Sequence, residues 1–307
     1  MLRDLDQFEF CHLRLELELL SEVTLPEFAL LRLRRDLRRS ALRLLGQRQA
    51  FVSLFDPPLG DDPESVRRYQ RPGPAFVLRP ALLAPTTLMV GDHLDLELVL
   101  VGRGIEYCNE FLACVEELGR NGLWAKEGQF SLAAVAVLEP PGEGQKRFYP
   151  DAPYFSSLPR ISGRWFLDGM PFSSRWNLTF ATPARLMVGN RPLFRGSLQR
   201  LIPFVLRRVT SMAHAHCGIE MIADPQSLLA RSADLAVCKG SLRWKDWQAV
   251  ETGGESHDLG GLVGGVSFTS PGDEDLLNLL QLGSLLGIGR GAAYGAGRYW
   301  LEPEEGA

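Results

Sequence analysis

Regular alternation of apolar and polar residues marks the beginning of the chain. Within Phe8–Leu20, the apolar residues at odd positions from Cys11 to Leu19 alternate with polar ones such as His12 and Arg14. A period of two places one side of a strand in a core and leaves the other side open. We therefore expect a strand over Phe8–Leu20 with one polar face.

A helical pattern follows this strand. Thr24 and Glu27 fit a capping box, and apolar residues then recur every three or four positions up to Leu45. The sequence predicts a helix that starts at this box. Its other faces are occupied by arginines, namely Arg32, Arg34, Arg35, Arg38, Arg39 and Arg43.

The remaining elements occur in the same order in both halves of the chain. In the first half we expect a strand at Leu94–Val101, a helix at Tyr107–Leu118, a loop at Gly119–Gly128 and a strand at Phe130–Leu138. In the second half we expect strands at Trp176–Val188, Ala233–Val250, Leu262–Thr269 and Arg298–Glu302, and helices at Leu193–His216 and Asp275–Leu286. Pro203 predicts a kink in the first of these helices, or its true start.

This order predicts the fold class. Strand–helix–strand, then strand–helix–strand, is the β-α-β-β-α-β order of a ferredoxin-like unit. We expect an α+β protein of two tandem ferredoxin-like (RRM-like) domains, at residues 1–140 and 166–307. A linker rich in proline, glycine and serine, residues 141–165, joins them.

A glycine-rich loop separates the last helix from the last strand. Six glycines lie within the fifteen residues from Gly283 to Gly297, with no acidic residue among them. Glycine allows close approach of backbone N–H groups to phosphate, arginine binds phosphate, and tyrosine offers a face for a base. The candidate nucleic-acid contacts are Gly289, Arg290, Gly291, Tyr294 and Arg298. The alternative is that the glycines only allow tight packing.

A dinucleotide-binding fingerprint is the other interpretation of these glycines, and the context excludes it. That motif follows a strand and opens a helix, whereas these glycines follow a helix and precede a strand. The spacing Gly287-x-Gly289-x-Gly291 also lacks the third glycine of the motif.

Composition narrows the class of protein further. The 307 residues are 45% apolar, and no apolar run is long enough to cross a bilayer. The N-terminus does not read as a signal peptide. Five scattered cysteines argue against a disulfide framework or a zinc site and favour a reducing cytoplasm. We expect a cytoplasmic protein with no metal, no cofactor and no membrane contact.

Arginine is clustered although the net charge is −4. Six arginines and no acid lie between Arg185 and Arg208, in addition to those of the first helix. Such clusters are the charge pattern that phosphate binding requires. Among them, Arg34, Arg35, Arg38 and Arg39 are candidate phosphate contacts. Because the chain has only four lysines, a general preference for arginine explains the clusters equally well.

Several stretches together resemble one known group of proteins. They are Leu25–Leu45, Phe76–Pro80 with Val90–Asp92, Thr182–Leu186, Leu242–Trp247, Leu259–Gly264 and Gly287–Tyr299. In this order they resemble the RAMP (repeat-associated) superfamily, and within it the CRISPR precursor-RNA-processing endoribonucleases. Because the stretches fall in both halves, the resemblance covers the whole chain.

The resemblance implies a function and partners. Members of that group bind a CRISPR repeat RNA and cleave it once without metal. The cleavage leaves a 2′,3′-cyclic phosphate. Many of them stay bound to the crRNA product with other subunits of a CRISPR effector complex. Many also place a catalytic histidine in or beside the first helix, whereas Pro26–Leu45 of this chain contains neither histidine nor tyrosine.

Histidine suits the two proton transfers of such a cleavage because its pKa lies near neutrality. The candidates are His214, on the helix face of Arg200 and Arg207, and His12, beside Arg14 on the polar strand face. His214 and His216 also fit a pair that complements the helix dipole, and His12 also fits a solvated strand residue. A non-catalytic RNA-binding subunit and a different enzyme with a phosphate-binding loop remain the alternative functions.

Overall fold

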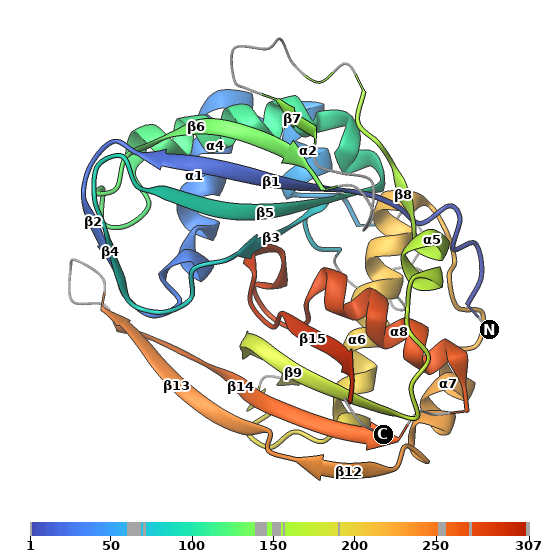
Figure 1. Cartoon of the computed structure of the whole chain (residues 1–307). Coiled ribbons are helices and arrows are strands. Elements are labelled where there is room, and N and C mark those ends of the chain that lie inside the picture. Colours follow the sequence, from blue (N-terminus) through green and yellow to red (C-terminus); the bar gives the residue numbers. More distant parts are fainter. Residues whose placement is uncertain are drawn as a thin grey trace.

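The structure is a computed structural model. It describes residues 2–59, 69, 72–138, 146–148, 155, 157–189, 191–250, 256–269 and 272–304. Two α+β units follow one another along the chain, and each consists of an antiparallel sheet with helices packed on it (Figure 1).

The first unit has the ferredoxin-like strand order. Its elements are β1 Glu9–Leu19, β2 Val23–Leu25, η1 Ala29–Arg32, α1 Arg34–Leu45, α2 Gln49–Phe55, β3 Phe76–Pro80, β4 Thr86–Leu88, β5 His93–Val101, η2 Gly102–Tyr107, α4 Cys108–Asn121, β6 Phe130–Val137, β7 Lys146–Phe148 and β8 Ile161–Ser162. The main sheet runs β3-β5-β1-β6-β7, and the short strand β8 pairs with β1. Helices α1, α2 and α4 cover one face of this sheet (Figure 1).

The second unit repeats this order. Its elements are α5 Gly163–Asp168, β9 Arg175–Ala184, β10 Met187–Val188, β11 Arg191–Pro192, α6 Leu198–Met212, η3 Ala213–Cys217, α7 Pro225–Ser232, β12 Val237–Gly240, β13 Arg243–Val250, β14 Ser256–Thr269, α8 Glu274–Leu286, η4 Ala292–Tyr294 and β15 Tyr299–Pro303. The sheet runs β12-β14-β9-β15, with β13 also paired to β14. The predicted tandem ferredoxin-like fold is confirmed.

Strand β1 shows how the alternating sequence builds both faces of the first sheet. Its odd-numbered residues, from Cys11 to Leu19, are buried in the hydrophobic core beneath α1, α2 and α4. On the other face, Phe8 and Phe10 belong to the core of the second unit, where Phe10 contacts Phe166 of α5 edge-on at 5.6 Å. The even-numbered positions then become polar from His12 onward. The second unit therefore covers this sheet face at Phe8 and Phe10, and the polar part of the face, from His12 onward, lies beside the junction of the two units.

The predicted capping box is wrong. Thr24 lies in β2 and pairs with Thr87 of β4, so its backbone is extended and cannot begin a helix. Phe28, which lies between β2 and the 3-10 turn η1, has a left-handed backbone (φ +58°). Helix α1 starts only after this turn, at Arg34. Because β2 pairs with β4, the helix starts about ten residues later than the local sequence pattern predicts. That pattern contains no information on the pairing of distant segments.

Three further boundaries differ from the prediction. Helix α6 begins at Leu198, so Pro203 lies inside it, and a π-helical turn extends it to Cys217. The expected strand at Ala233–Val250 is two strands, β12 and β13. Strand β3 was not expected from the pattern, because its five residues are nearly all buried and show no alternation. Much of the proposed linker lies outside the described residues.

Within the ranges that the structure describes, no helix combines the length necessary for crossing a bilayer with a sufficiently apolar composition.

Candidate functional site

The glycine-rich loop between α8 and β15 reaches out of the second unit into the first. Gly287, Gly289, Gly291, Gly295 and Gly297 all have positive φ, which an L-residue adopts only at a cost. Turn η4 of this loop contacts β3 and η1 of the first unit. The loop is therefore held by both domains (Figure 1).

Tyr294 is the anchor of this loop, and the expectation of an exposed ring is corrected. Only 4% of the residue is exposed, and its ring lies in the core of the first unit, edge-on to Phe76 at 5.5 Å. Burial raises the pKa of its hydroxyl to about 12. In this structure the ring has no free face for an RNA base, because the core of the first domain encloses it.

Arg298 is also drawn inward. It is 8% exposed, donates a hydrogen bond from a terminal nitrogen to the Pro80 carbonyl at 3.4 Å, and lies 4.0 Å over the ring of Trp300. Burial, followed by the nearby charge of Arg79, lowers the pKa of Arg298 to about 10. The residue therefore links the end of the loop to β3 of the first domain.

Arg290 is the outward-facing cation of the loop. Its side chain is exposed, and its backbone N–H donates to the Arg185 carbonyl at 2.9 Å. Gly289 and Gly291 flank it in left-handed conformations. A Cβ on Gly289 would lie 2.6 Å from the same carbonyl, so only glycine allows the loop to approach this closely.

The arginines of α1 lie next to the loop. Arg34, Arg35 and Arg39 are exposed, whereas Arg38 binds Asp56 at 3.1 Å and lies over the ring of Phe51. Turns η1 and η4 are in contact, and the charges of Arg34 and Arg38 act on the Tyr294 hydroxyl. The structure thus brings the basic end of α1 and the glycine-rich loop, about 250 residues apart in sequence, to one surface.

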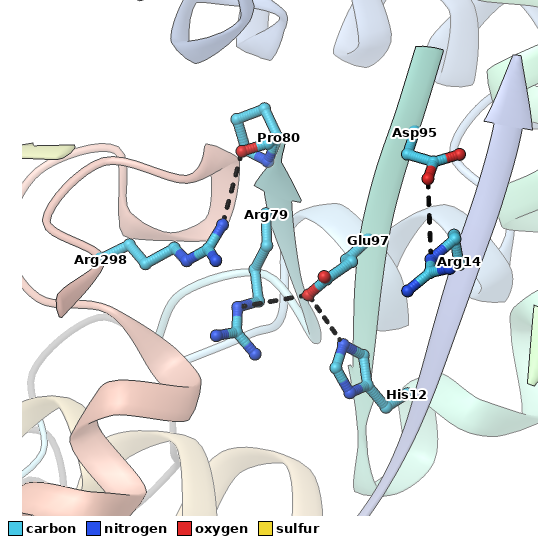
Figure 2. A network of polar contacts seen from close by, with 7 residues as sticks. All are labelled: His12, Arg14, Arg79, Pro80, Asp95, Glu97 and Arg298. Atoms are coloured by element: carbon cyan, nitrogen blue, oxygen red, sulfur yellow. Dashed lines mark hydrogen bonds and ion pairs between the residues drawn. The ribbon is translucent and has the colours of Figure 1, made fainter. Parts of the chain in front are cut away.

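A network of polar contacts lies at the domain junction (Figure 2). His12 of β1 contacts Glu97 of β5 through Nε2 at 3.1 Å, and Arg79 of β3 lies 3.8 Å from the same carboxylate oxygen. Arg298 approaches from the second domain, as Figure 2 shows, and binds the carbonyl of Pro80. Three strands of one domain and the loop of the other therefore converge here.

The charges in this network fix the protonation of His12. Burial would raise the pKa of Glu97, but the hydrogen bond from His12 and the charge of Arg79 outweigh it and lower that pKa to about 2. Burial is the main cause that lowers the pKa of His12. At neutral pH the ionised Glu97 can only accept, so Nε2 of His12 carries the hydrogen and Nδ1 keeps its lone pair. His12 is thus oriented as a proton acceptor.

The positive charges around Glu97 outnumber the negative ones. Arg79 and Arg298 face the single carboxylate of Glu97, while His12 is neutral. Within the part of the chain that is described, Nε of each arginine is buried and has no hydrogen-bond partner. Buried donors without partners are uncommon in proteins. An anion at this junction would supply both the missing acceptor and the missing charge.

His214 lies elsewhere, at the π-helical end of α6. It is half-buried, and its ring stacks on Tyr69 at a centroid distance of 4.2 Å. The contacts described for His214 and His12 have no residue in common, so the structure does not join the two candidate histidines in one network. The sequence places His214 on the helix face of Arg200 and Arg207, which suggests an exposed side chain, whereas in the structure it is stacked and half-buried.

His216 lies deeper at the same helix end, on the apolar side of the helix that includes Val209 and Met212. It is 3% exposed, and its Nε2 contacts the Gly73 carbonyl at 2.9 Å. Since a carbonyl only accepts, Nε2 must be protonated and donate. Burial lowers the pKa of His216 to about 4.

Acidification should therefore destabilise the protein through His216. Its pKa is about 4 in the folded chain and near 6.5 when unfolded, so the unfolded state gains a proton as pH falls from 7 to 4. The expected loss is about 3 kcal/mol of unfolding free energy, absent in His216→Gln, which keeps an N–H donor for Gly73. Urea unfolding of both proteins at pH 7 and pH 4 measures it, and an equal loss in the two would contradict it.

Sequence reasoning missed Glu97 and Arg79. Glu97 occupies a polar position in the predicted strand Leu94–Val101, and Arg79 lies in the stretch Phe76–Pro80. The feature of the sequence that could have identified them is a charged residue within an otherwise apolar strand. The register His12↔Val99 and Arg79↔Glu97, which brings the three side chains together, is not visible in the sequence.

In the regions that the structure describes, no group of three or more histidine, cysteine, aspartate or glutamate side chains is placed to hold a metal ion.

Comparison with known proteins assigns each half of the chain. Residues 8–154 match the family described as the AF_1859_N N-terminal domain, and residues 178–299 match the CRISPR-associated endoribonuclease Cas6 family. The second domain is therefore similar to the Cas6 endoribonucleases over the matched residues. The Cas6 match begins in β9 and ends at the first residue of β15, so it includes the glycine-rich loop. The resemblance to CRISPR-associated processing endoribonucleases is confirmed.

Solved structures extend the likeness over both domains. A Cas6 product complex (17% identity, TM-score 0.55) and Thermus thermophilus Cas6 (15%, 0.53) cover 95% and 96% of this chain, and 99% of their own chains. A chain of the partial Cas6-RT-Cas1–Cas2 complex (12%, 0.61) covers 97% of this chain, which spans only 47% of that one. No curated protein matches in sequence. At these identities the likeness establishes the fold.

Proposed function

We propose that the chain binds CRISPR repeat RNA and cleaves precursor crRNA by metal-independent transesterification. The observation that carries the proposal is the Cas6 match over residues 178–299, within a tandem fold shared along nearly the whole length of Cas6 chains. Its partners would be the repeat RNA, the crRNA product and, through the product, other subunits of a CRISPR effector complex. Incubation with repeat RNA in excess EDTA tests the proposal.

The junction network supplies groups suited to this reaction. The 2′-oxygen must lose its proton and attack the phosphorus, and the bond from phosphorus to the 5′-oxygen must break, which leaves a 2′,3′-cyclic phosphate. We assign the proton acceptor to Nδ1 of His12, oriented by Glu97, and stabilisation of the phosphorane charge to Arg79 and Arg298. The 5′-oxygen takes its proton from the solvent.

RNA binding would use the surface formed by α1 and the glycine-rich loop. Arg290, Arg34, Arg35 and Arg39 are exposed there and suit phosphate contacts, with Arg38 held beside them by Asp56. In this proposal Gly289 and Gly291 shape the loop around Arg290.

Removal of these cations should weaken binding and flatten its dependence on salt. For Arg34→Ala/Arg35→Ala/Arg290→Ala, the slope of log affinity against log salt should fall by roughly 0.7 per lost contact, or about 2 in total. Arg3→Ala, an exposed arginine near the N-terminus, is the matched control and should leave the slope unchanged. Fluorescence polarisation with labelled repeat RNA from about 50 to about 300 mM salt measures the slope. A triple variant with the wild-type slope would remove this surface from the interface.

The pH dependence of cleavage should reflect the lowered pKa of His12. Its neutral form is the base, so the rate should rise with pH only below the ordinary histidine range and be constant above about 6.5. In Glu97→Gln the carboxylate that raises the pKa of His12 is gone, so the rise should move to still lower pH. Single-turnover rates from pH 4 to 8 test this, and a wild-type midpoint above 6.5 would contradict the assignment.

A non-catalytic crRNA-binding subunit is the second candidate function. The observation that favours it is that α1, with the residues leading into it from Pro26, contains neither histidine nor tyrosine. Tight binding of repeat RNA without cleavage in any buffer would select this alternative.

A further inference from the structure

A hollow of about 550 Å³ lies between the two domains, apart from the His12 network. Its wall is formed by Phe28 of the first domain and by Phe180, Ala181, Ser241, Arg243, Lys245, Val263 and Gly264 of the second. This volume is within the range of small-molecule sites, about 300–1,000 Å³. Its lining is mostly apolar, and two cations stand among the residues that form it.

Phe28 is unusual both in its backbone and in its packing. Its φ of +58° is a left-handed conformation, which costs an L-residue of this size roughly 1–2 kcal/mol. Its ring is only 8% exposed but belongs to neither hydrophobic core of the molecule. Strained residues of this kind are concentrated at ligand-binding sites. Phe28 lines the hollow and is a member of neither core.

The two cations of the hollow differ in how they are held. Lys245 binds Glu27 at 2.6 Å, across the domain junction, and its ammonium group lies 5.3 Å from the centre of the Phe28 ring. Arg243 is exposed, and the structure describes no ion pair or hydrogen bond for its side chain. Since Glu27 neutralises Lys245, Arg243 gives the hollow its positive charge.

The bulge in β14 shapes the opposite wall. The register with β9 shifts between Leu262 and Gly264, and Gly264 has φ +97°. A Cβ at Gly264 would overlap the carbonyl of Ser241, so a side chain there would close the gap between β14 and the β12–β13 turn. Ser241 adds a hydroxyl at the rim.

We propose that this hollow binds one unpaired nucleotide, with its base against Phe28 and its phosphate on Arg243. An aromatic face, an apolar wall and an unpaired arginine are the groups that recognise single-stranded nucleotides. The inference rests on the proposed function, in which the nucleotide belongs to the repeat RNA. A free nucleoside monophosphate has the same chemistry and is the other source of the ligand.

Replacement of single nucleotides in the RNA by abasic ones tests the base contact. At one position, loss of the base should weaken wild-type binding about tenfold, and in Phe28→Leu that sensitivity should disappear. Phe172→Leu alters a fully exposed phenylalanine and is the matched control, in which the sensitivity should persist. An abasic profile of Phe28→Leu identical to that of the wild type would overturn the proposal.

The phosphate contact is tested separately. Arg243→Gln should lower the salt slope of RNA binding by about 0.7, while Arg3→Gln should leave it unchanged. An unchanged slope in Arg243→Gln would remove that arginine from the site. Thermal unfolding of each variant shows whether the fold is retained. If Phe28→Leu unfolds, Phe28→Gly is the second variant without the ring, because glycine adopts the left-handed backbone without strain.

Failure of the proposed function remains distinguishable from failure of this inference. If wild type and Phe28→Leu bind repeat RNA with equal affinity at every abasic position, the proposed nucleotide site is refuted and the proposed function is unaffected. If wild type binds no repeat RNA, the function fails and the four nucleoside 5′-monophosphates become the probe. Calorimetric binding of one of them that is lost in Phe28→Leu supports the hollow as a mononucleotide site, and binding of none refutes it.

Discussion

His12→Ala is expected to slow single-turnover cleavage of repeat RNA by roughly 10²–10⁴-fold. The substitution removes the neutral imidazole whose Nε2 is held by Glu97 and whose Nδ1 is assigned the 2′-hydroxyl proton. RNA affinity should change little, because the proposed binding surface of α1 and the glycine-rich loop is left intact. Cleavage rates at saturating protein, together with binding isotherms, separate the two effects.

The matched control is His93→Ala. His93 lies on β5 of the same sheet, is more exposed and contacts Glu16 at 2.8 Å, so its loss should change the rate less than a few-fold. His214→Ala tests the second candidate in the same assay. If His12→Ala cleaves at the wild-type rate while remaining folded, the junction network is not the catalytic centre.

Gly297→Ala should destabilise the protein by at least about 2 kcal/mol and weaken RNA binding with it. Gly297 has φ +64°, and a Cβ there would overlap the carbonyl of Ile288, the residue whose N–H closes the loop by donating to the Gly297 carbonyl at 3.0 Å. Since this is a backbone overlap, no side-chain rotation relieves it. Urea unfolding measures the loss of stability, and polarisation measures the loss of affinity.

Gly272→Ala provides the comparison for this variant. A Cβ at Gly272 meets no atom within 4 Å, so the substitution should alter stability by less than about 0.5 kcal/mol. Equal unfolding curves for Gly297→Ala and the wild type would mean that the loop does not adopt the conformation described.

The order of elements could be predicted because each half repeats local patterns that are strong by themselves. The alternation in β1 predicts a buried and an open face, and the observed burial follows it from Cys11 to Leu19 but not at Phe10, which the second domain buries. Helix α8 and the strand after the glycine-rich loop were predicted within one or two residues. The start of α1 was not, since the β2–β4 pairing that displaces it joins residues about 60 positions apart.

The candidate site was less predictable, because it depends on how the two domains pack. Tyr294 has the composition of a stacking residue in an open loop, but the first domain encloses it. Arg79, Glu97 and Arg298 converge only through the register of three strands and the reach of the loop. A sequence pattern describes one element at a time and contains no information on such convergence.

The most direct test of the central claim is cleavage without metal. Purified protein is incubated in excess EDTA with a labelled CRISPR repeat RNA, and the product ends are analysed. The account predicts one cut that ends in a 2′,3′-cyclic phosphate and is blocked by a 2′-deoxy nucleotide at that position. Tight binding of the repeat with no cut, or a cut that the 2′-deoxy nucleotide does not block, would contradict it.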